Sequence, residues 1–158
     1  MVRTFSLAIA LFGFWLALSG HYTPFLITIG FFAVLATVYF ATKMGLIDAE
    51  GHPIQLVPAA LTYVPWLIVE IVKSAWSVTK AILSPTLSIS PTMTIVKASQ
   101  RTNAGLATYA NSITLTPGTI TVAVNGDKFT VHALESAGAD DLEAGGMDKR
   151  VSQFEGGA

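Results

Sequence analysis

The sequence of 158 residues contains no cysteine and few charged side chains. Without cysteine, the chain cannot form disulfides, use a thiol nucleophile or ligate a metal through sulfur. Charged residues make up 12% of the chain, roughly half of their usual share in soluble domains. The formal net charge of −1 offers no basic face for nucleic acid. These absences exclude thiol chemistry and a nucleic-acid partner, and they leave a chain that is 52% hydrophobic.

Charge is missing altogether from a long N-terminal run. After Arg3 the next charged side chain is Lys43, and a charge-free apolar run of this length indicates insertion into a membrane. A Gly-His-Tyr-Thr-Pro break divides the run, because Gly and Pro interrupt helices. We therefore predict a transmembrane hairpin over residues 1–43, with helices at about 2–20 and 25–42.

A cleaved signal peptide is the alternative reading of the first apolar run. Arg3 would supply its basic start and the residues at 17–19 its cleavage site. The second run would survive cleavage, so at least one span remains, and the similar lengths and tight turn favour an uncleaved hairpin. Because Arg3 and Lys43 flank the hairpin and the turn has no basic residue, both of its ends are predicted to face the cytoplasm. Neither span contains an ionisable residue, so the hairpin is predicted to anchor the chain and not to carry ions.

A third hydrophobic segment follows a predicted connecting segment at residues 44–64. At about 100° per residue, a helix over residues 65–84 has one polar arc and an apolar arc opposite to it. Burying one central lysine in lipid costs roughly 2.5–3.5 kcal/mol, whereas each Leu, Ile or Val returns about 0.3–0.6 kcal/mol. This amphipathic helix is therefore predicted to lie at the membrane interface. The alternative is a third span whose polar arc faces partner subunits.

The polar arc supplies the candidate site residues. They are Glu70, Lys73, Ser77 and Lys80. Glu70 and Lys73 are three residues apart and can pair on the helix surface. One reading makes the pair part of an ion path. We favour a solvated or partner-facing stripe, because the pair continues an arc of serines.

The remaining residues, 90–158, have the alternating texture of a small soluble domain. A strand is predicted at Met93–Ala98, followed by a short helix from an Asn103 cap to about Asn111. Two further strands and a possible final helix, weakened by Gly145-Gly146, complete the prediction. The predicted fold class is an α-helical membrane hairpin plus an amphipathic helix, followed by a small α+β domain of β-α-β-β order. The domain is predicted to be cytoplasmic.

The last two strands carry a hairpin signal. Asn125-Gly126 is a preferred two-residue turn between alternating runs. Closing the hairpin at this turn predicts Val122 opposite Phe129 and Ile120 opposite Val131, with the threonines on the other face. One face of the sheet would then be apolar and the other largely polar.

Motifs of catalysis are missing from the sequence. It has no glycine-rich phosphate loop, nucleophile elbow or metal-ligand pair, and its three histidines are far apart. The acidic residues Asp140, Asp141 and Glu143 are predicted to form a charge cluster at a helix start. We expect no active site and no cofactor.

Two short stretches resemble a known family. NSITLTPGT at residues 111–119 and VHAL at 131–134 are similar to the signature of the E-type subunit of the bacterial multisubunit monovalent cation/proton antiporters, the Mrp or Mnh complexes. The order of hydrophobic N-terminus, Glu-x-x-Lys segment and soluble domain is also similar. The resemblance implies an accessory component of a plasma-membrane complex that exchanges sodium for protons and supports alkali and salt tolerance. Its implied partners are the other antiporter subunits and the lipid bilayer.

Three functional hypotheses follow from the sequence. The first is an accessory or structural subunit of an antiporter. The second is a direct ion-path subunit that uses Glu70 and Lys73. The third is a membrane-anchored module whose C-terminal domain binds a ligand by itself.

Overall fold

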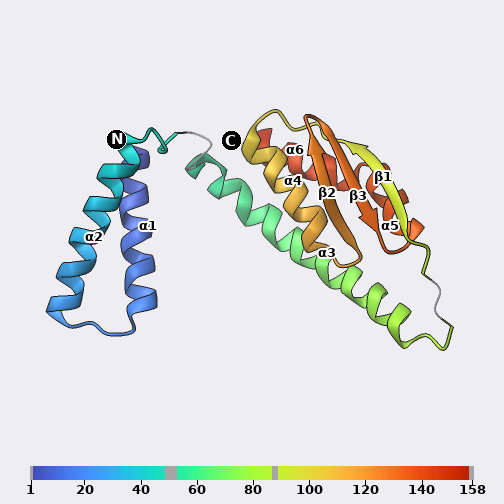
Figure 1. Ribbon diagram of the computed structural model, residues 1–158, viewed down its shortest axis with the longest axis horizontal. Coiled ribbons are helices and arrows are strands. Elements are labelled where there is room, and N and C mark those ends of the chain that lie inside the picture. The colour runs from blue at the N-terminus through green and yellow to red at the C-terminus, as the bar shows by residue number, and fades with distance from the viewer. Residues whose placement is uncertain (1, 49–52, 87–88, 157–158) are drawn as a thin grey trace. The chain divides into compact units, whose positions relative to one another are not determined.

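The computed structural model describes residues 2–48, 53–86 and 89–156 (Figure 1). The chain divides into two compact units, residues 1–54 and 55–158, and each is described by itself. The first is a helical hairpin, and the second combines a long helix with a small α+β domain. The predicted fold class is confirmed.

The hairpin consists of α1 (Val2–Ser19) and α2 (Pro24–Lys43). The turn ends at Thr23, whose hydroxyl accepts a hydrogen bond from the Leu26 amide as the N-cap of α2. Pro24 occupies the first turn of α2, where a missing N–H costs nothing. The limits of both helices differ from the predicted ones, 2–20 and 25–42, by at most one residue.

The long helix, α3 (Val57–Leu83), follows a short 3-10 turn at Ile54–Leu56. It begins eight residues before the predicted start at Pro65, and Pro58 lies in its first turn. Proline inside a helix removes one hydrogen bond, here the one to the carbonyl of Leu61. Leu61 and Pro65 both lie on the exposed side of α3, so the unpaired carbonyl is not buried by the rest of the unit. The last eight residues of the segment predicted to be a connection, 57–64, belong to α3.

A three-stranded antiparallel sheet forms the centre of the domain. Its strands are β1 (Thr92–Lys97), β2 (Thr119–Asn125) and β3 (Lys128–Ala133), in the order β1-β3-β2. Helices α4 (Asn103–Leu115), α5 (Ser136–Glu143) and α6 (Gly146–Gly156) cover one face of the sheet (Figure 1). Helix α3 packs on the outside of this helical layer, against α6.

The predicted register of the β2–β3 hairpin is wrong by one residue. The strands pair Asn125 with Lys128 and Ile120 with His132, and the turn consists of Gly126 and Asp127. Gly126 has a φ of 62° and occupies the first central position, where a type II′ turn requires glycine. A bulge between Thr121 and Ala123 shifts the pairing again.

This shift changes which side chains are buried. The apolar residues of β2 lie exposed on the outer side of the sheet or at its edge, while Thr119 and Thr121 turn inward. The exposed apolar residues of β1 and β2 make the outer face of the sheet apolar, whereas a largely polar face was predicted. Its exposed members are Met93, Ile95, Ile120 and Val122.

Helix α4 differs from its predicted limits at both ends. Its N-cap is Thr102, whose hydroxyl accepts a hydrogen bond from the Gly105 amide, and not Asn103. It continues through Leu115, four residues past the predicted end at about Asn111. Packing explains the extra turn, because Ile113 lies fully buried in the core.

The C-terminal tail forms two helices, α5 and α6, instead of one. Gly145, with a φ of 73°, ends the first and turns the chain into the second. The core of the unit joins residues from all its layers. The buried members are Tyr63, Leu67, Val96, Ala98, Tyr109, Ile113, Phe129, Val131, Leu142 and Val151.

Candidate functional site

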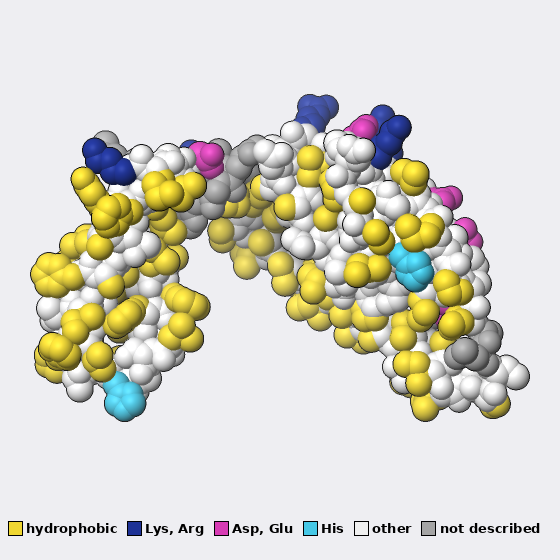
Figure 2. All heavy atoms as spheres, in the orientation of Figure 1, with side chains coloured by type: hydrophobic (Ala, Val, Ile, Leu, Met, Phe, Trp, Pro, Cys, Tyr) yellow, Lys and Arg dark blue, Asp and Glu magenta, His cyan; other side chains and the backbone are white. Residues whose placement is uncertain are grey.

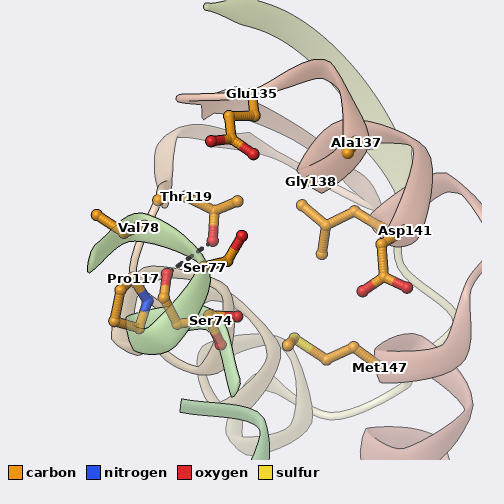
Figure 3. Close-up of a pocket in the computed structure, with 13 residues that line it drawn as sticks. Ser74, Ser77, Val78, Pro117, Thr119, Glu135, Ala137, Gly138, Asp141 and Met147 are labelled. Carbon is orange, nitrogen blue, oxygen red and sulfur yellow. Dashed lines mark hydrogen bonds between the residues drawn. The ribbon is translucent and has the colours of Figure 1, made fainter. Parts of the chain in front are cut away.

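The seam between α3 and the domain brings together the polar arc of α3 and the 111–119 segment. A cavity of about 220 Å³ lies at this seam. Figure 3 shows the side chains that line it. Its walls come from the middle of α3, the loop before β2 and helix α5. The lining residues are Ser74, Ser77, Val78, Thr116, Pro117, Gly118, Thr119, Glu135, Ala137, Gly138, Asp141, Leu142 and Met147.

The polar side chains of this seam cavity are carboxylates and hydroxyls. Glu135 and Asp141 contribute carboxylates, α3 contributes two serine hydroxyls, and no basic residue lines the wall. Within the described residues neither carboxylate forms an ion pair. No group of three His, Asp or Glu side chains in the described part of the chain could hold a metal ion. The charged side chains of this lining are therefore all acidic.

The predicted site residues do not converge on one point. Lys73 Nζ lies 2.8 Å from Glu70 Oε1, in an ion pair whose lysine side chain is 64% exposed. Lys80 Nζ lies 5.6 Å from the ring centre of Trp76, on the exposed surface of α3. Only Ser77 lines the seam cavity. Of the predicted residues, Ser77 thus faces the cavity, whereas Lys73 and Lys80 lie on the exposed surface of α3.

The 111–119 segment forms the corner on which α3 rests. Tyr63 Oη and Ser112 Oγ are 2.6 Å apart, and both side chains are buried. Thr116 and Thr119 use their hydroxyls to bind the last carbonyls of α4. Gly118 has a φ of 91°, and a Cβ at this position would lie 3.2 Å from Val78 Cγ2. The Tyr63–Ser112 pair and Gly118 thus hold the corner close to α3, while the two threonines close the end of α4.

The N-terminal half of α3 packs on α6 through aromatic rings. Tyr63 contacts Phe154 and Trp66, with ring centres 4.9 and 5.6 Å away. The Arg150 guanidinium lies 5.5 Å from the ring centre of Trp66. A second cavity of about 330 Å³, here named the α6 cavity, opens beside this cluster. It is lined by Pro58, Ala59, Thr62, Tyr63, Arg150, Gln153 and Phe154.

The opposite side of α3 is apolar and uncovered within its unit. Its side chains are between 47% and 77% exposed, and they recur at helical spacing along the whole helix. We name this set the exposed stripe; it consists of Val57, Leu61, Val64, Ile68, Val72, Trp76 and Leu83. In Figure 2 hydrophobic side chains line the lower edge of this part of the molecule.

Two ionisable groups in the domain have shifted pKa values. Burial, aided by the negative charge of Asp148, raises the pKa of Tyr109 to about 12. Burial alone would raise the pKa of Glu155, but hydrogen bonds from Thr102 and the Arg101 and Thr102 amides, with the Arg101 charge, hold it below its ordinary value. Gly105 makes room for this carboxylate, since a Cβ there would lie 2.8 Å from Glu155 Oε1. Glu155 thereby ties α6 to the start of α4.

The hairpin unit has its own packing. The Trp15 indole N–H donates a hydrogen bond of 3.2 Å to the Leu26 carbonyl oxygen, and the indole lies directly over Gly30. A side chain at Gly30 would collide with the ring. Close approach at glycine is a common way for helices to associate in lipid. In all, three helices among the described residues, counting α3 with its preceding turn, are long and apolar enough to cross a membrane.

Comparison with known proteins identifies the family. A sequence model for the family described as "MNHE: Na+/H+ ion antiporter subunit" matches residues 8–154. The chain belongs to this family. The match covers the hairpin, α3 and the domain together, so it confirms the resemblance drawn from residues 111–119 and 131–134. This family member is a membrane protein and a subunit of an ion-transport complex.

Individual relatives agree with the family match. The protein named "Na(+)/H(+) antiporter subunit E1" from Staphylococcus aureus strain JH9 is 27% identical over 124 residues, which are 77% of this chain and 76% of that protein. The same protein of strain Newman gives the same values. A chain in the structure of the membrane-bound sulfane sulfur reductase, an archaeal respiratory membrane complex, is 27% identical with a TM-score of 0.74. That likeness covers 98% of this family member and 99% of the other chain.

Sequence reasoning missed three residues that organise the seam of this family member. Tyr63 falls in the predicted connecting segment, although the apolar periodicity of α3 continues back past Pro65. Ser112 belongs to the segment that carries the resemblance, but its burial depends on α4 continuing past Asn111. Arg150 has no local signal, because its ring partner Trp66 is distant in the sequence.

Proposed function

We propose that this chain is a non-catalytic accessory subunit of a multisubunit monovalent cation/proton antiporter in the bacterial plasma membrane, where it supports assembly and activity of sodium/proton exchange. Its partners are the other antiporter subunits and the bilayer. The observation that carries the proposal is the two-sided character of α3. One side packs on the C-terminal domain, and the other is an exposed apolar stripe.

The hairpin acts as an anchor in this proposal. Between Thr4 and Thr42 its two helices have no Asp, Glu, Lys, Arg or His, and a carrier of protons or cations needs such groups within the bilayer. Arg3 and Lys43 place both hairpin ends on the cytoplasmic side by the positive-inside rule. The connection after Lys43 then keeps the C-terminal domain in the cytoplasm.

Helix α3 lies along the membrane surface in this proposal, with its exposed stripe in the bilayer interface. Length and composition alone would allow it to span. However, the domain packs against α3 from Tyr63 to Val78, so a spanning α3 would draw a hydrophilic domain into the lipid. Spanning would also bury Lys73, at a cost of roughly 2.5–3.5 kcal/mol. An interfacial helix avoids both costs.

The relatives support a structural role, because they belong to complexes that carry out different reactions. One relative is a subunit of an antiporter, and another belongs to a respiratory complex that reduces sulfane sulfur. A subunit shared between such different complexes fits a structural task better than a catalytic one. Accordingly, the isolated chain should transport nothing, while its deletion should disable or disassemble the complex.

Affinity purification tests the accessory role. The tagged full chain is extracted from native membranes in mild detergent, and its companions are identified by mass spectrometry. A stoichiometric set of larger hydrophobic antiporter subunits is the expected result. Recovery of the chain alone, under conditions in which other membrane complexes remain whole, would contradict the proposal and favour a stand-alone ligand-binding module.

The natural absence of cysteine allows a clean test of topology. Single cysteines replace Tyr22 in the hairpin turn and Lys128 beside the domain turn, both of which are exposed. An impermeant maleimide added to whole cells should label Tyr22→Cys but not Lys128→Cys. Labelling of both positions from outside would show that the chain crosses the membrane a third time.

The ion-path alternative has its own test. Glu70 and Lys73 form an ion pair at the edge of α3, with the lysine largely exposed. If they only face solvent or a partner, Glu70→Gln should leave sodium/proton exchange unchanged in the intact complex. Loss of exchange with the complex still assembled would support a direct role for the pair.

A further inference from the structure

Basic side chains line one flank of α3, between the exposed stripe and the domain. Thr62, Lys73 and Lys80 are spaced by eleven and seven residues, which places them on one side of the helix. Arg150 reaches the same flank from α6, through its contact with Trp66 and its place in the α6 cavity with Thr62. We name Lys73, Lys80 and Arg150 the basic flank. Along the axis of α3, the distance from Thr62, beside Arg150, to Lys80 is roughly 27 Å.

Both tryptophans of α3 are paired with cations of this flank. Arg150 lies over Trp66, and Lys80 lies over Trp76, with distances of 5.5 and 5.6 Å to the ring centres. In the hairpin unit, Lys43 at the end of α2 lies over Tyr39 in the same way, at 5.9 Å. Tryptophan, tyrosine and basic residues gather at the level of lipid headgroups, where the ring is half apolar and the cation meets phosphate.

The α6 cavity is an open hollow beside the flank. Arg150 and Gln153 bring hydrogen-bond donors to its mouth, and no carboxylate lines it. Pro58, Tyr63 and Phe154 form an apolar wall, and Pro58 lies three residues before Leu61 of the exposed stripe. Within the described residues Arg150 forms no ion pair, so its charge is available to an outside anion.

We propose that the α6 cavity and the basic flank bind the headgroup of an anionic phospholipid. Arg150 binds the phosphate as a fork of donors. Lys80 extends the positive surface along the helix, together with the largely exposed Lys73, whose charge is partly offset by its ion pair with Glu70. The acyl chains run beside Leu61 over the exposed stripe. The proposal rests on the proposed function in one respect, namely that the exposed stripe of α3 lies in the bilayer interface.

The apolar surroundings of the basic residues favour a lipid over a soluble anion. A small phosphate needs only the donors at the mouth of the cavity, whereas the apolar wall and the adjoining stripe match the glycerol and acyl part of a lipid. Each basic residue near an anionic membrane surface contributes about fivefold in affinity. Loss of Arg150 should therefore weaken binding several-fold without abolishing the contribution of the two lysines.

Native mass spectrometry of the purified full chain in mild detergent tests the proposal. Phosphatidylglycerol and phosphatidylcholine with identical acyl chains are titrated separately. The chain should bind phosphatidylglycerol in preference, and Arg150→Gln should lower this preference about threefold to fivefold. Arg150→Lys, which keeps the charge, should retain part of it. The matched control is Lys128→Gln, which removes an exposed charge beside the sheet turn and should change the preference less than twofold.

Three outcomes would overturn the proposal. They are equal binding of the two lipids, an unchanged preference in Arg150→Gln with an unchanged melting temperature, and complete displacement of the lipid by millimolar inorganic phosphate. The last would assign the site to a small soluble anion.

A second measurement separates this proposal from the proposed function. A single cysteine at Ile68 in the exposed stripe carries an environment-sensitive dye, and brominated lipids quench it if α3 lies in the interface. No quenching would contradict the proposed position of α3 itself. Quenching without a preference for phosphatidylglycerol would contradict only the lipid site.

Discussion

Tyr63 of α3 and Ser112 of α4 share a buried hydrogen bond of 2.6 Å between their hydroxyl oxygens. Ser112 also donates to the Thr108 carbonyl at 2.7 Å, so its proton is committed and Tyr63 acts as the donor to Ser112. The bond joins a helix that bears the exposed apolar stripe to the segment that carries the family resemblance. It makes α3 part of the domain and not a separate anchor.

Removal of the Tyr63 hydroxyl should loosen this junction. Tyr63→Phe keeps the ring contacts but loses one buried hydrogen bond, so we expect destabilisation of about 1 kcal/mol. Thermal unfolding of the full chain in detergent should show a melting temperature lower by about 2–4 °C. Tyr22→Phe, at an exposed tyrosine in the hairpin turn, is the control and should leave the melting temperature unchanged. Equal effects of the two changes would show that the bond contributes nothing to stability.

A methyl group at Gly118 should be harmful. Gly118→Ala would place a side chain at a φ of 91° and within 3.2 Å of Val78, so we expect a loss of more than about 1 kcal/mol. Gly138→Ala, in α5, is the matched control. A Cβ there would make only ordinary contacts, at 3.6 Å with Thr119 and 3.9 Å with Ala133. Chemical denaturation of the two variants in detergent compares them. A Gly118→Ala protein as stable as Gly138→Ala would contradict the close approach of α3 to the corner.

The hairpin should depend on one of its two helix glycines. Gly30→Ala would collide with the Trp15 indole and break its hydrogen bond to Leu26, at an expected cost of about 1–3 kcal/mol. Gly13→Ala meets nothing within 4 Å and should be neutral or slightly stabilising. Retention of the solubilised chain after graded heating measures both. If Gly13→Ala is the more damaging change, the hairpin packs through a different face.

Glu155 should make the stability of the domain depend on pH. Its folded pKa lies below the ordinary value, so its contribution is present above the unfolded pKa and is lost as the pH falls through the folded pKa. Because the carboxylate is partly exposed, we expect Glu155→Gln to cost only about 1 kcal/mol at neutral pH. Below about pH 4 the difference from the parent chain should shrink. Melting temperatures at pH 7 and pH 3.5 test this, and a constant difference would contradict the assigned hydrogen bonds.

Local composition was enough to predict much of the fold. The hairpin helices follow from a charge-free apolar run with a Gly and Pro break, and the amphipathic character of α3 follows from its helical period. The order β-α-β-β follows from alternating strands, a capping residue and a Gly-containing turn. These features depend on neighbours within a few residues, which is why they can be read before folding is known.

Other features could not be predicted because they depend on distant contacts. The β2–β3 register differs by one residue because the turn consists of Gly126 and Asp127, and a bulge between Thr121 and Ala123 of β2 shifts the pairing again. Helix α3 begins before Pro65 because Tyr63 gains a buried place against α4 and α6 that outweighs one lost backbone bond. Arg150 joins the site only through its contact with Trp66 of another helix.

The amino-acid sequence of this protein is enough to predict that the chain enters a membrane. It also shows the run without acidic or basic side chains between Arg3 and Lys43, and it indicates the family. Composition and short motifs are enough for these properties, because partition into lipid depends on the sum of side-chain hydrophobicity along a segment. Which side of α3 faces the domain, and which side remains free, emerges only in the folded chain. That choice depends on the fit of Tyr63, Trp66 and Leu67 against α4 and α6, and such packing energy exists only once segments distant in the sequence have come together.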